Sequence, residues 1–463
     1  MSSLLFEQLD NSGFLRSGAV NVERIRRASV ADLVDAASES IALTSAAEIG
    51  RSTSPYEHTA SMSLGGGPNP CSAIDCRIGH SDQLAQFASL YSDSVYVHNL
   101  LGDHAHHPDR YTKDSLPEFR QKVVDDLTVL NRMRPLVEAG RIVPVTAPLA
   151  TCSGCGSAMI ALLDTEVERR FKRARRSVFS RYAAELVIDF ELRGGRVGAH
   201  MRGPEDLLEH GERYFLFSDT SKIFSEIPRL KKSLAEGGAP TRLTKREAAR
   251  AGLNAGQALV VLRDLRFELA VGQSLGTSLL TDRPISFDLV NRIAGTDAVR
   301  RRNEVIREHL TTIVPFLDGV PPQELLRLRQ TDGDSFVLFR HALNEAVDEA
   351  CASKSTFSSA DAKALYGDVI APRLARLGVT VRAARRTLVK DAGRKTAGWV
   401  GAIAFGQLTG LLPASLAVTA KALGLTKVIA DLTADTLKPV DKTSPIRADS
   451  MFFLWQVKQL SKK

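Results

Sequence analysis

The stretch SVYVHNL, residues 94–100, alternates along its length and is typical of a β-strand. The next segment, 118–139, has a helical pattern, and RIVPV at 141–145 predicts a second short strand. Three more strand-like segments follow: ELVIDFEL (185–192), RVGAHMR (196–202) and RYFLFSD (213–219). From about 240 to 435 the pattern is helical, punctuated by Gly and Pro. We therefore expect an α+β, predominantly helical protein.

A chain of 463 residues is long enough for two or three folded units. We expect a mixed α+β unit over 1–225 and an all-helical unit over 226–463. Residues 1–50 read as helical, with a capping box from Ser29 to Asp32, and Ser81 is a candidate start for a helix that ends at Leu90. The stretch SLGGGPNP at 63–70 predicts a loop. The apolar segment MFFLWQVKQL at 451–460 is expected to dock onto the helical unit.

Composition narrows the choice of compartment and partner. The N-terminal residues have acidic side chains and no long apolar core, so we expect no secretory signal. Five cysteines are too few for a disulfide scaffold, and a reducing cytoplasm is expected. A net charge of +8 favours anionic partners without identifying one, and an aromatic content of 6% argues against a protein that stacks single-stranded nucleic acid.

Four of the five cysteines lie in two closely spaced pairs, Cys71 with Cys76 and Cys152 with Cys155. Each pair stands beside turn residues, and two such pairs can supply the four thiolates of a tetrahedral zinc site. We expect a structural zinc that joins the two segments, with His80 as an alternative ligand. Two other interpretations stay open: buried thiols that pack as small apolar side chains, and a redox pair at Cys152 and Cys155.

Interleaved His and Asp residues at 103–109 indicate a second candidate metal site. His104, His106 and Asp109 are ligand types that a hydrolytic metal centre uses. Their order does not match a known metallohydrolase pattern, and the downstream sequence offers no convincing further metal ligands. A solvated loop is therefore the favoured interpretation. The sequence contains no phosphate-binding GxxxxGK[ST] loop, no strand followed by GxGxxG, no HExxH and no GxSxG.

A charged helix is expected from about 157 to 185, and its segment 169–181 holds seven positive charges and no negative one. One face of this helix could track a phosphate backbone or another anion, through Arg169, Lys172, Arg173 and Arg176. A solvated helix balanced by the upstream acids is favoured over that alternative, and sequence-specific nucleic-acid recognition is not expected.

The C-terminal half contains 25 consecutive uncharged residues, 396–420, after a basic run at 373–395. Small residues recur every four positions, as in helices whose backbones pack closely, at Gly398, Ala402, Gly406 and Gly410. The content of Gly and Ala is high and Pro413 interrupts the stretch, so a buried helical hairpin is favoured over a membrane-inserting segment.

We expect from these patterns a cytoplasmic protein that acts by binding, assembly or regulation rather than by turnover, braced by a structural zinc. Its partners would be another protein or further copies of the chain. One alternative is a toxin-like or defence-like effector that uses 373–420 to associate peripherally with an anionic membrane. The other is a metal-dependent hydrolase.

Overall fold

The structure is a computed structural model that describes residues 2–44, 52, 54, 56–68, 71–105, 115–146, 165–193, 196–208, 211–217, 220–236, 240–294, 322–353, 449 and 452–460. Helices predominate and are accompanied by several sheets, so the expected α+β, mainly helical class is confirmed. By contacts the chain divides into two units, Met1–Ala88 with Ser92–Arg300, and Ser89–Tyr91 with Arg301–Lys463. Residues 226–300 therefore contribute to the same unit as the N-terminal strands.

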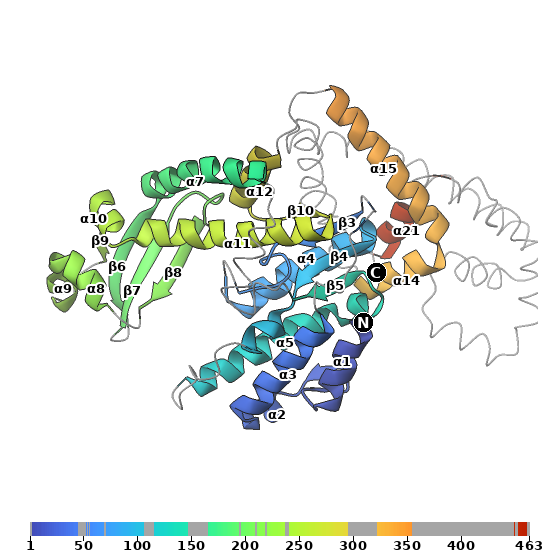
Figure 1. Cartoon of the computed structure of the whole chain (residues 1–463), viewed down its shortest axis with the longest axis horizontal. Coiled ribbons are helices and arrows are strands. Elements are labelled where there is room, and N and C mark those ends of the chain that lie inside the picture. Colours follow the sequence, from blue (N-terminus) through green and yellow to red (C-terminus); the bar gives the residue numbers. More distant parts are fainter. Residues whose placement is uncertain are drawn as a thin grey trace, which may run out of the picture. The chain divides into compact units, whose positions relative to one another are not determined.

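A parallel sheet lies at the centre of the first unit (Figure 1). Its strands are β3 (Glu57–Ala60), β4 (Ser94–His98), β5 (Ile142–Val145) and β10 (Ser278–Leu280), in the spatial order β10-β3-β4-β5. The chain steps outward from β3 to β5 and then returns to place β10 beside the opposite edge of β3. In sheets of this type ligands bind beyond the carboxyl ends of the strands, near the point where the strand order reverses.

Helices from the N-terminal part of the unit support this sheet. α3 (Val30–Leu43) begins with the expected capping box at Ser29 and Asp32, and it packs on the short 3₁₀ helix η2 (Leu100–Ala105). α5 (Leu116–Glu138) packs on β5 and is joined by α1 (Ser2–Asn11) and α2 (Val22–Arg27). A two-stranded ribbon, β1 (Leu15–Arg16) with β2 (Ala19–Val20), lies between those two helices in the chain.

The helix after the glycine-rich loop begins earlier than expected. α4 spans Ile74–Leu90, so Ser81 lies in the interior of the helix, where its hydroxyl donates to the Ile78 carbonyl. The prediction that a helix starts at Ser81 is wrong, because serine can bond to its own helix backbone as well as cap an end.

An antiparallel sheet in the order β8-β7-β6-β9 forms the other part of the first unit. β6 (Val187–Arg193), β7 (Arg196–Arg202) and β8 (Glu212–Leu216) confirm the three expected strands, and β9 (Thr241–Arg242) adds to the edge of β6. Helices complete this part: α7 (Thr165–Glu185), α8 (Ser221–Glu226), α9 (Pro228–Ala235), α10 (Lys245–Arg250) and α12 (Pro284–Ala294). β9 and β10 fall within the region expected to be helical, since strands of two and three residues are too short to show a period.

One long helix, α11 (Leu253–Leu275), packs against both sheets (Figure 1). Its first half packs into the core of the antiparallel sheet through Ala258, Val261 and Leu262. Its second half packs against Tyr96 of β4 and Val145 of β5 through Ala270, Val271 and Leu275. The helix therefore holds side chains of its middle turns above the parallel sheet.

The second unit is described over three helices, α14 (Pro322–Thr331), α15 (Gly333–Ser353) and α21 (Phe452–Leu460). α21 packs on both of the others, with the Phe453 ring 5.2 Å from that of Phe336 and 5.8 Å from that of Phe339. The expected docking of the apolar segment 451–460 is confirmed.

Candidate functional site

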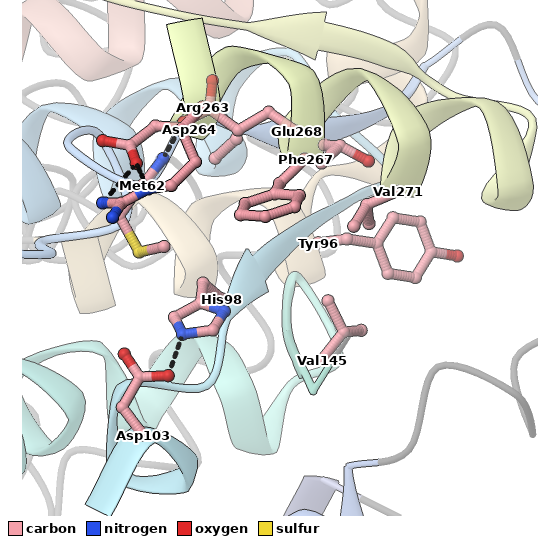
Figure 2. A pocket seen from close by; sticks show the side chains of 12 residues that line it. Met62, Tyr96, His98, Asp103, Val145, Arg263, Asp264, Phe267, Glu268 and Val271 are labelled. Carbon is pink, nitrogen blue, oxygen red and sulfur yellow. Dashed lines mark hydrogen bonds and ion pairs between the residues drawn. The ribbon is translucent and has the colours of Figure 1, made fainter. Parts of the chain in front are cut away.

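A cavity of about 230 Å³ lies beyond the carboxyl ends of β3, β4 and β5 (Figure 2). The strands and the loops after them supply one wall, and α11 supplies the other. The lining residues are Thr59, Ala60, Met62, Tyr96, His98, Asp103, Val145, Arg263, Asp264, Phe267, Glu268 and Val271. The cavity thus occupies the position that parallel sheets most often use for ligands.

Helical spacing explains why one face of α11 lines the cavity. Arg263, Asp264, Phe267, Glu268 and Val271 stand at positions i, i+1, i+4, i+5 and i+8, which share one face of a helix. The carboxylates and the aromatic ring are therefore neighbours on a rigid element.

A histidine and an aspartate form a hydrogen-bonded pair on the strand side. His98 is the last residue of β4, and its Nε2 lies 2.9 Å from Oδ1 of Asp103, in the 3₁₀ helix that follows. Burial alone lowers the pKa of His98, but the charge and hydrogen bond of Asp103, with the charges of Asp126 and Glu268, raise the pKa above the ordinary value. No other described residue hydrogen-bonds to His98, so its Nδ1 is available to a ligand.

Glu268 is the most perturbed acid of the cavity. Its side chain is 8% exposed, and Oε1 accepts a hydrogen bond of 2.8 Å from the backbone N–H of Met62. Burial raises the pKa of Glu268 to about 7, although the Met62 N–H and the positive charge of Arg283 oppose the shift. The residue therefore changes charge near neutral pH.

Asp264, one turn before Glu268, is 4% exposed and lies between two arginines. Its Oδ1 accepts from Nη2 of Arg263 at 3.0 Å, and Nη1 of Arg283 lies 4.0 Å from Oδ2. Burial raises the pKa of Asp264, while the charges of both arginines act against that shift. Oδ2 is buried without a hydrogen bond from the described residues.

The glycine-rich loop after β3 does not offer its amides to a ligand. The N–H groups of Gly65, Gly66 and Gly67 donate to carbonyl oxygens within the loop, and that of Met62 donates to Glu268. Gly66 has φ +81°, and a Cβ there would collide with Val129. A phosphate-binding loop needs free amides directed at the phosphate. The loop therefore positions Met62 rather than holding an anion.

Beside this loop, His80 and two serines, Ser61 and Ser63, converge on Asp282, two residues after the end of β10. Nδ1 of His80 lies 2.6 Å from Oδ2 of Asp282, and the Ser63 hydroxyl donates to Oδ1 at 2.8 Å. Burial raises the pKa of Asp282, but the hydrogen bond and charge of His80, with the Ser63 bond, bring the pKa below its ordinary value. His80 thus has a carboxylate partner beside the cavity.

The structure describes only some of the other residues singled out for metal binding. Cys71 and Cys76 form no disulfide bond with the described residues and have intermediate exposure, and Cys152 and Cys155 lie outside the described residues. Among the residues that the structure describes, no group of three or more His, Cys, Asp and Glu side chains is placed to hold a metal ion. The four-cysteine zinc site stays a prediction.

The loop at 103–109 was expected to be solvated, yet His104 is buried. Its Nε2 lies 2.6 Å from Oδ2 of Asp126, and its ring makes an edge contact with Phe119. His106 and Asp109 lie outside the described residues, so the hydrolytic metal site stays untested there. Where it is described, His104 belongs to the packing between η2 and α5.

The basic helix is α7, whose buried face consists of Phe171, Ala174, Val178 and Tyr182. Arg169 pairs with Glu166, and Nζ of Lys172 lies 3.7 Å from Glu168. Arg173 and Arg176 are exposed. Two of the four candidate anion-binding residues thus have acidic partners within the helix, and binding of an anion stays a prediction.

The membrane hypothesis rests on residues that the structure does not describe, including Gly398, Ala402, Gly406 and Gly410. Within the described ranges, no helix combines the length and apolar character needed to cross a bilayer.

Comparisons with known proteins identify no relative of this chain. No protein-family model matches the chain. No curated protein sequence matches it significantly, and neither does any solved structure.

Proposed function

We propose that the cavity above β3, β4 and β5 is a small-molecule site in which Glu268 and His98 transfer protons to and from the ligand. One observation supports this most strongly: two titratable groups from different elements face one cavity, and both have shifted pKa values. Burial raises the pKa of Glu268 to about 7, and the Asp103 partner raises that of His98. Perturbed pairs of this kind concentrate at functional sites.

The two groups suit complementary roles. A general base or acid works best when its pKa lies near the operating pH, and Glu268 meets that condition. His98 is oriented through Nε2 by Asp103, so a ligand would meet Nδ1, which accepts a proton in the neutral ring and donates one in the cation. The ionised form of Glu268 would act as the base, and the protonated form of His98 as the acid.

Binding without turnover is the second candidate, and it agrees with the expectation from the sequence. The hydrogen bond from the Met62 N–H to Glu268 ties the loop after β3 to α11. A carboxylate held in this way can serve as a fixed contact for a ligand as well as a base. The two candidates share the cavity and differ only in whether the ligand is chemically changed.

The test combines a titration with a fragment screen on the full chain. NMR of ¹³C-labelled glutamate should give a pKa near 7 for one residue, and Glu268→Gln should remove that signal. Fragments from a diverse library should shift the ring resonances of His98, and turnover of a bound fragment should fall in Glu268→Gln but not in the exposed control Glu118→Gln. A Glu268 pKa near the ordinary 4.5 would refute the proton-transfer role. A library in which no fragment moves the His98 resonances would refute the site itself.

A further inference from the structure

We propose that the ligand of this cavity is an organic amine or amidine carried on a small apolar ring. The inference rests on the proposed function, since it takes the cavity as a ligand site, and it adds the chemical class of that ligand.

The first argument is the pairing of charges around the cavity. Each of the two cationic side chains that line the cavity is hydrogen-bonded to a carboxylate: Arg263 to Asp264, and His98 to Asp103. Glu268 is the third carboxylate and has no cationic partner within hydrogen-bond distance among the described residues. An anionic ligand would therefore face an unpaired acid, whereas a cation would neutralise it.

The second argument is the supply of hydrogen-bond acceptors. Oε1 of Glu268 receives the Met62 N–H, but Oε2 receives no hydrogen bond from the described residues. Oδ2 of Asp264 is buried and also accepts none, with Arg283 4.0 Å away. Both side chains are more than nine-tenths buried, and a buried acceptor without a donor, such as Oδ2 of Asp264, is costly. A ligand with N–H groups would satisfy them.

The third argument is the apolar part of the lining. Figure 2 shows Phe267 and Glu268 projecting from α11, with Tyr96 and His98 on β4. Met62, Val145 and Val271 add further apolar contact. A cation held over an aromatic face gains additional attraction, most of all where water is excluded. Because about 230 Å³ is below the roughly 300–1,000 Å³ usual for drug-sized ligands, the apolar body should be no larger than about one ring.

The interpretation that competes with this one is purely structural. Asp264 and Glu268 could be acids that brace α11 against the loops through Arg263, Arg283 and Met62. The structural interpretation predicts no preference among small ligands of different charge, whereas the amine proposal predicts a preference for cations. Binding of ligands that differ only in charge therefore distinguishes the two interpretations.

The experiment measures binding of three matched probes to the full chain by calorimetry: benzylamine, benzyl alcohol and benzoate. Benzylamine should bind most tightly at about pH 8 and benzoate should not bind, because Glu268 is ionised there. Glu268→Gln keeps an acceptor for the Met62 N–H and should weaken benzylamine about 10- to 100-fold, as expected for a lost charge-assisted bond. Glu118→Gln, an exposed change on α5, should leave the affinity unchanged.

The affinity for benzylamine should also fall between about pH 8 and pH 6 as Glu268 takes up a proton. The charged groups that act on Glu268 are Asp264, Asp282, Arg283 and His98, and the growing charge of the His98 cation acts in the same direction. In Glu268→Gln the remaining pH dependence should be smaller. If that variant does not fold, Asp264→Asn tests the affinity instead, and it should also weaken benzylamine binding.

Three results would overturn the amine assignment. These are tighter binding of benzoate than of benzylamine, equal affinity of benzylamine for the wild type and both variants, and no binding by any probe. In each case the proposed function survives if other fragments still shift the His98 resonances. The proposed function fails together with the amine assignment only when no fragment in the library shifts the His98 resonances either.

Discussion

Replacing Asp126 by alanine should destabilise the first unit severely, because this carboxylate is the centre of a buried polar network. It accepts from the Arg77 guanidinium, which is 3% exposed, and its Oδ2 lies 2.6 Å from Nε2 of His104. Arg77 also donates from Nε to the Gly66 carbonyl at 2.7 Å. Asp126 therefore joins α4, η2, α5 and the glycine-rich loop.

The magnitude follows from the bonds that are lost. Two hydrogen bonds to a charged group at about 1.5–3 kcal/mol each give about 3–6 kcal/mol, which overlaps the roughly 3–5 kcal/mol cost of leaving one buried charge unpaired. This is a large fraction of the roughly 5–15 kcal/mol that stabilises a typical domain. The neighbouring Asp125, which accepts from Gln121 at the surface, is the matched control and should cost about 0.5 kcal/mol or less.

Urea unfolding followed by far-UV circular dichroism measures the effect. Tryptophan fluorescence is unsuitable, since Trp399 and Trp455 both belong to the second unit. A double replacement, Arg77→Met with Asp126→Leu, should recover part of the loss because it removes both charges together. If Asp126→Ala and Asp125→Ala unfold at the same urea concentration, the network does not contribute as described.

Three further predictions concern other parts of the chain. Because burial raises the pKa of Glu268, the folded state binds its proton more tightly than the unfolded state does. The resulting stabilisation is complete below about pH 4.5 and is lost as the pH rises to about 7. Between those pH values the free energy of unfolding of the wild type should fall by about 3 kcal/mol relative to that of Glu268→Gln, as measured by urea unfolding at each pH. Gly66→Ala should cost at least about 2 kcal/mol in thermal unfolding, since the new Cβ collides with α5, whereas Gly140→Ala, also at positive φ but with open space, should cost only about 1 kcal/mol. Elemental analysis should find about one zinc per chain, lost in Cys152→Ser, and a metal-free wild-type protein would leave the cysteines as ordinary thiols.

The strands with a visible apolar or alternating pattern could be predicted from sequence, and β3, β9 and β10 could not. β4, β6 and β7 have enough residues for their pattern to be visible, and all three are confirmed. β3 and β10 have four and three residues in a parallel sheet, where pairing comes from distant parts of the chain. Their sequences, EHTA and SLL, contain no period that distinguishes a strand from a loop.

The cavity was harder to predict than the sheet. His98 belongs to the histidine-rich region, but its partners across the cavity lie on a helix more than 150 residues later in the chain. A signal for the acids did exist: Asp264 and Glu268 stand four residues apart in a helix whose other buried positions are mainly apolar. Helical spacing alone could place both acids on one face, but only the tertiary structure identifies what that face meets.

The order in which the parallel sheet is completed has a consequence for synthesis of the protein. β3 pairs with β4 on one edge and with β10 on the other, and β10 begins 180 residues after β4 ends (278 minus 98). At about 5–20 residues per second, a ribosome needs roughly 10–40 s to make that interval. Throughout this time the nascent chain carries a strand with an open edge, together with an apolar surface that α11 later covers. The protein should therefore depend on chaperones during translation more than a chain whose sheet closes locally.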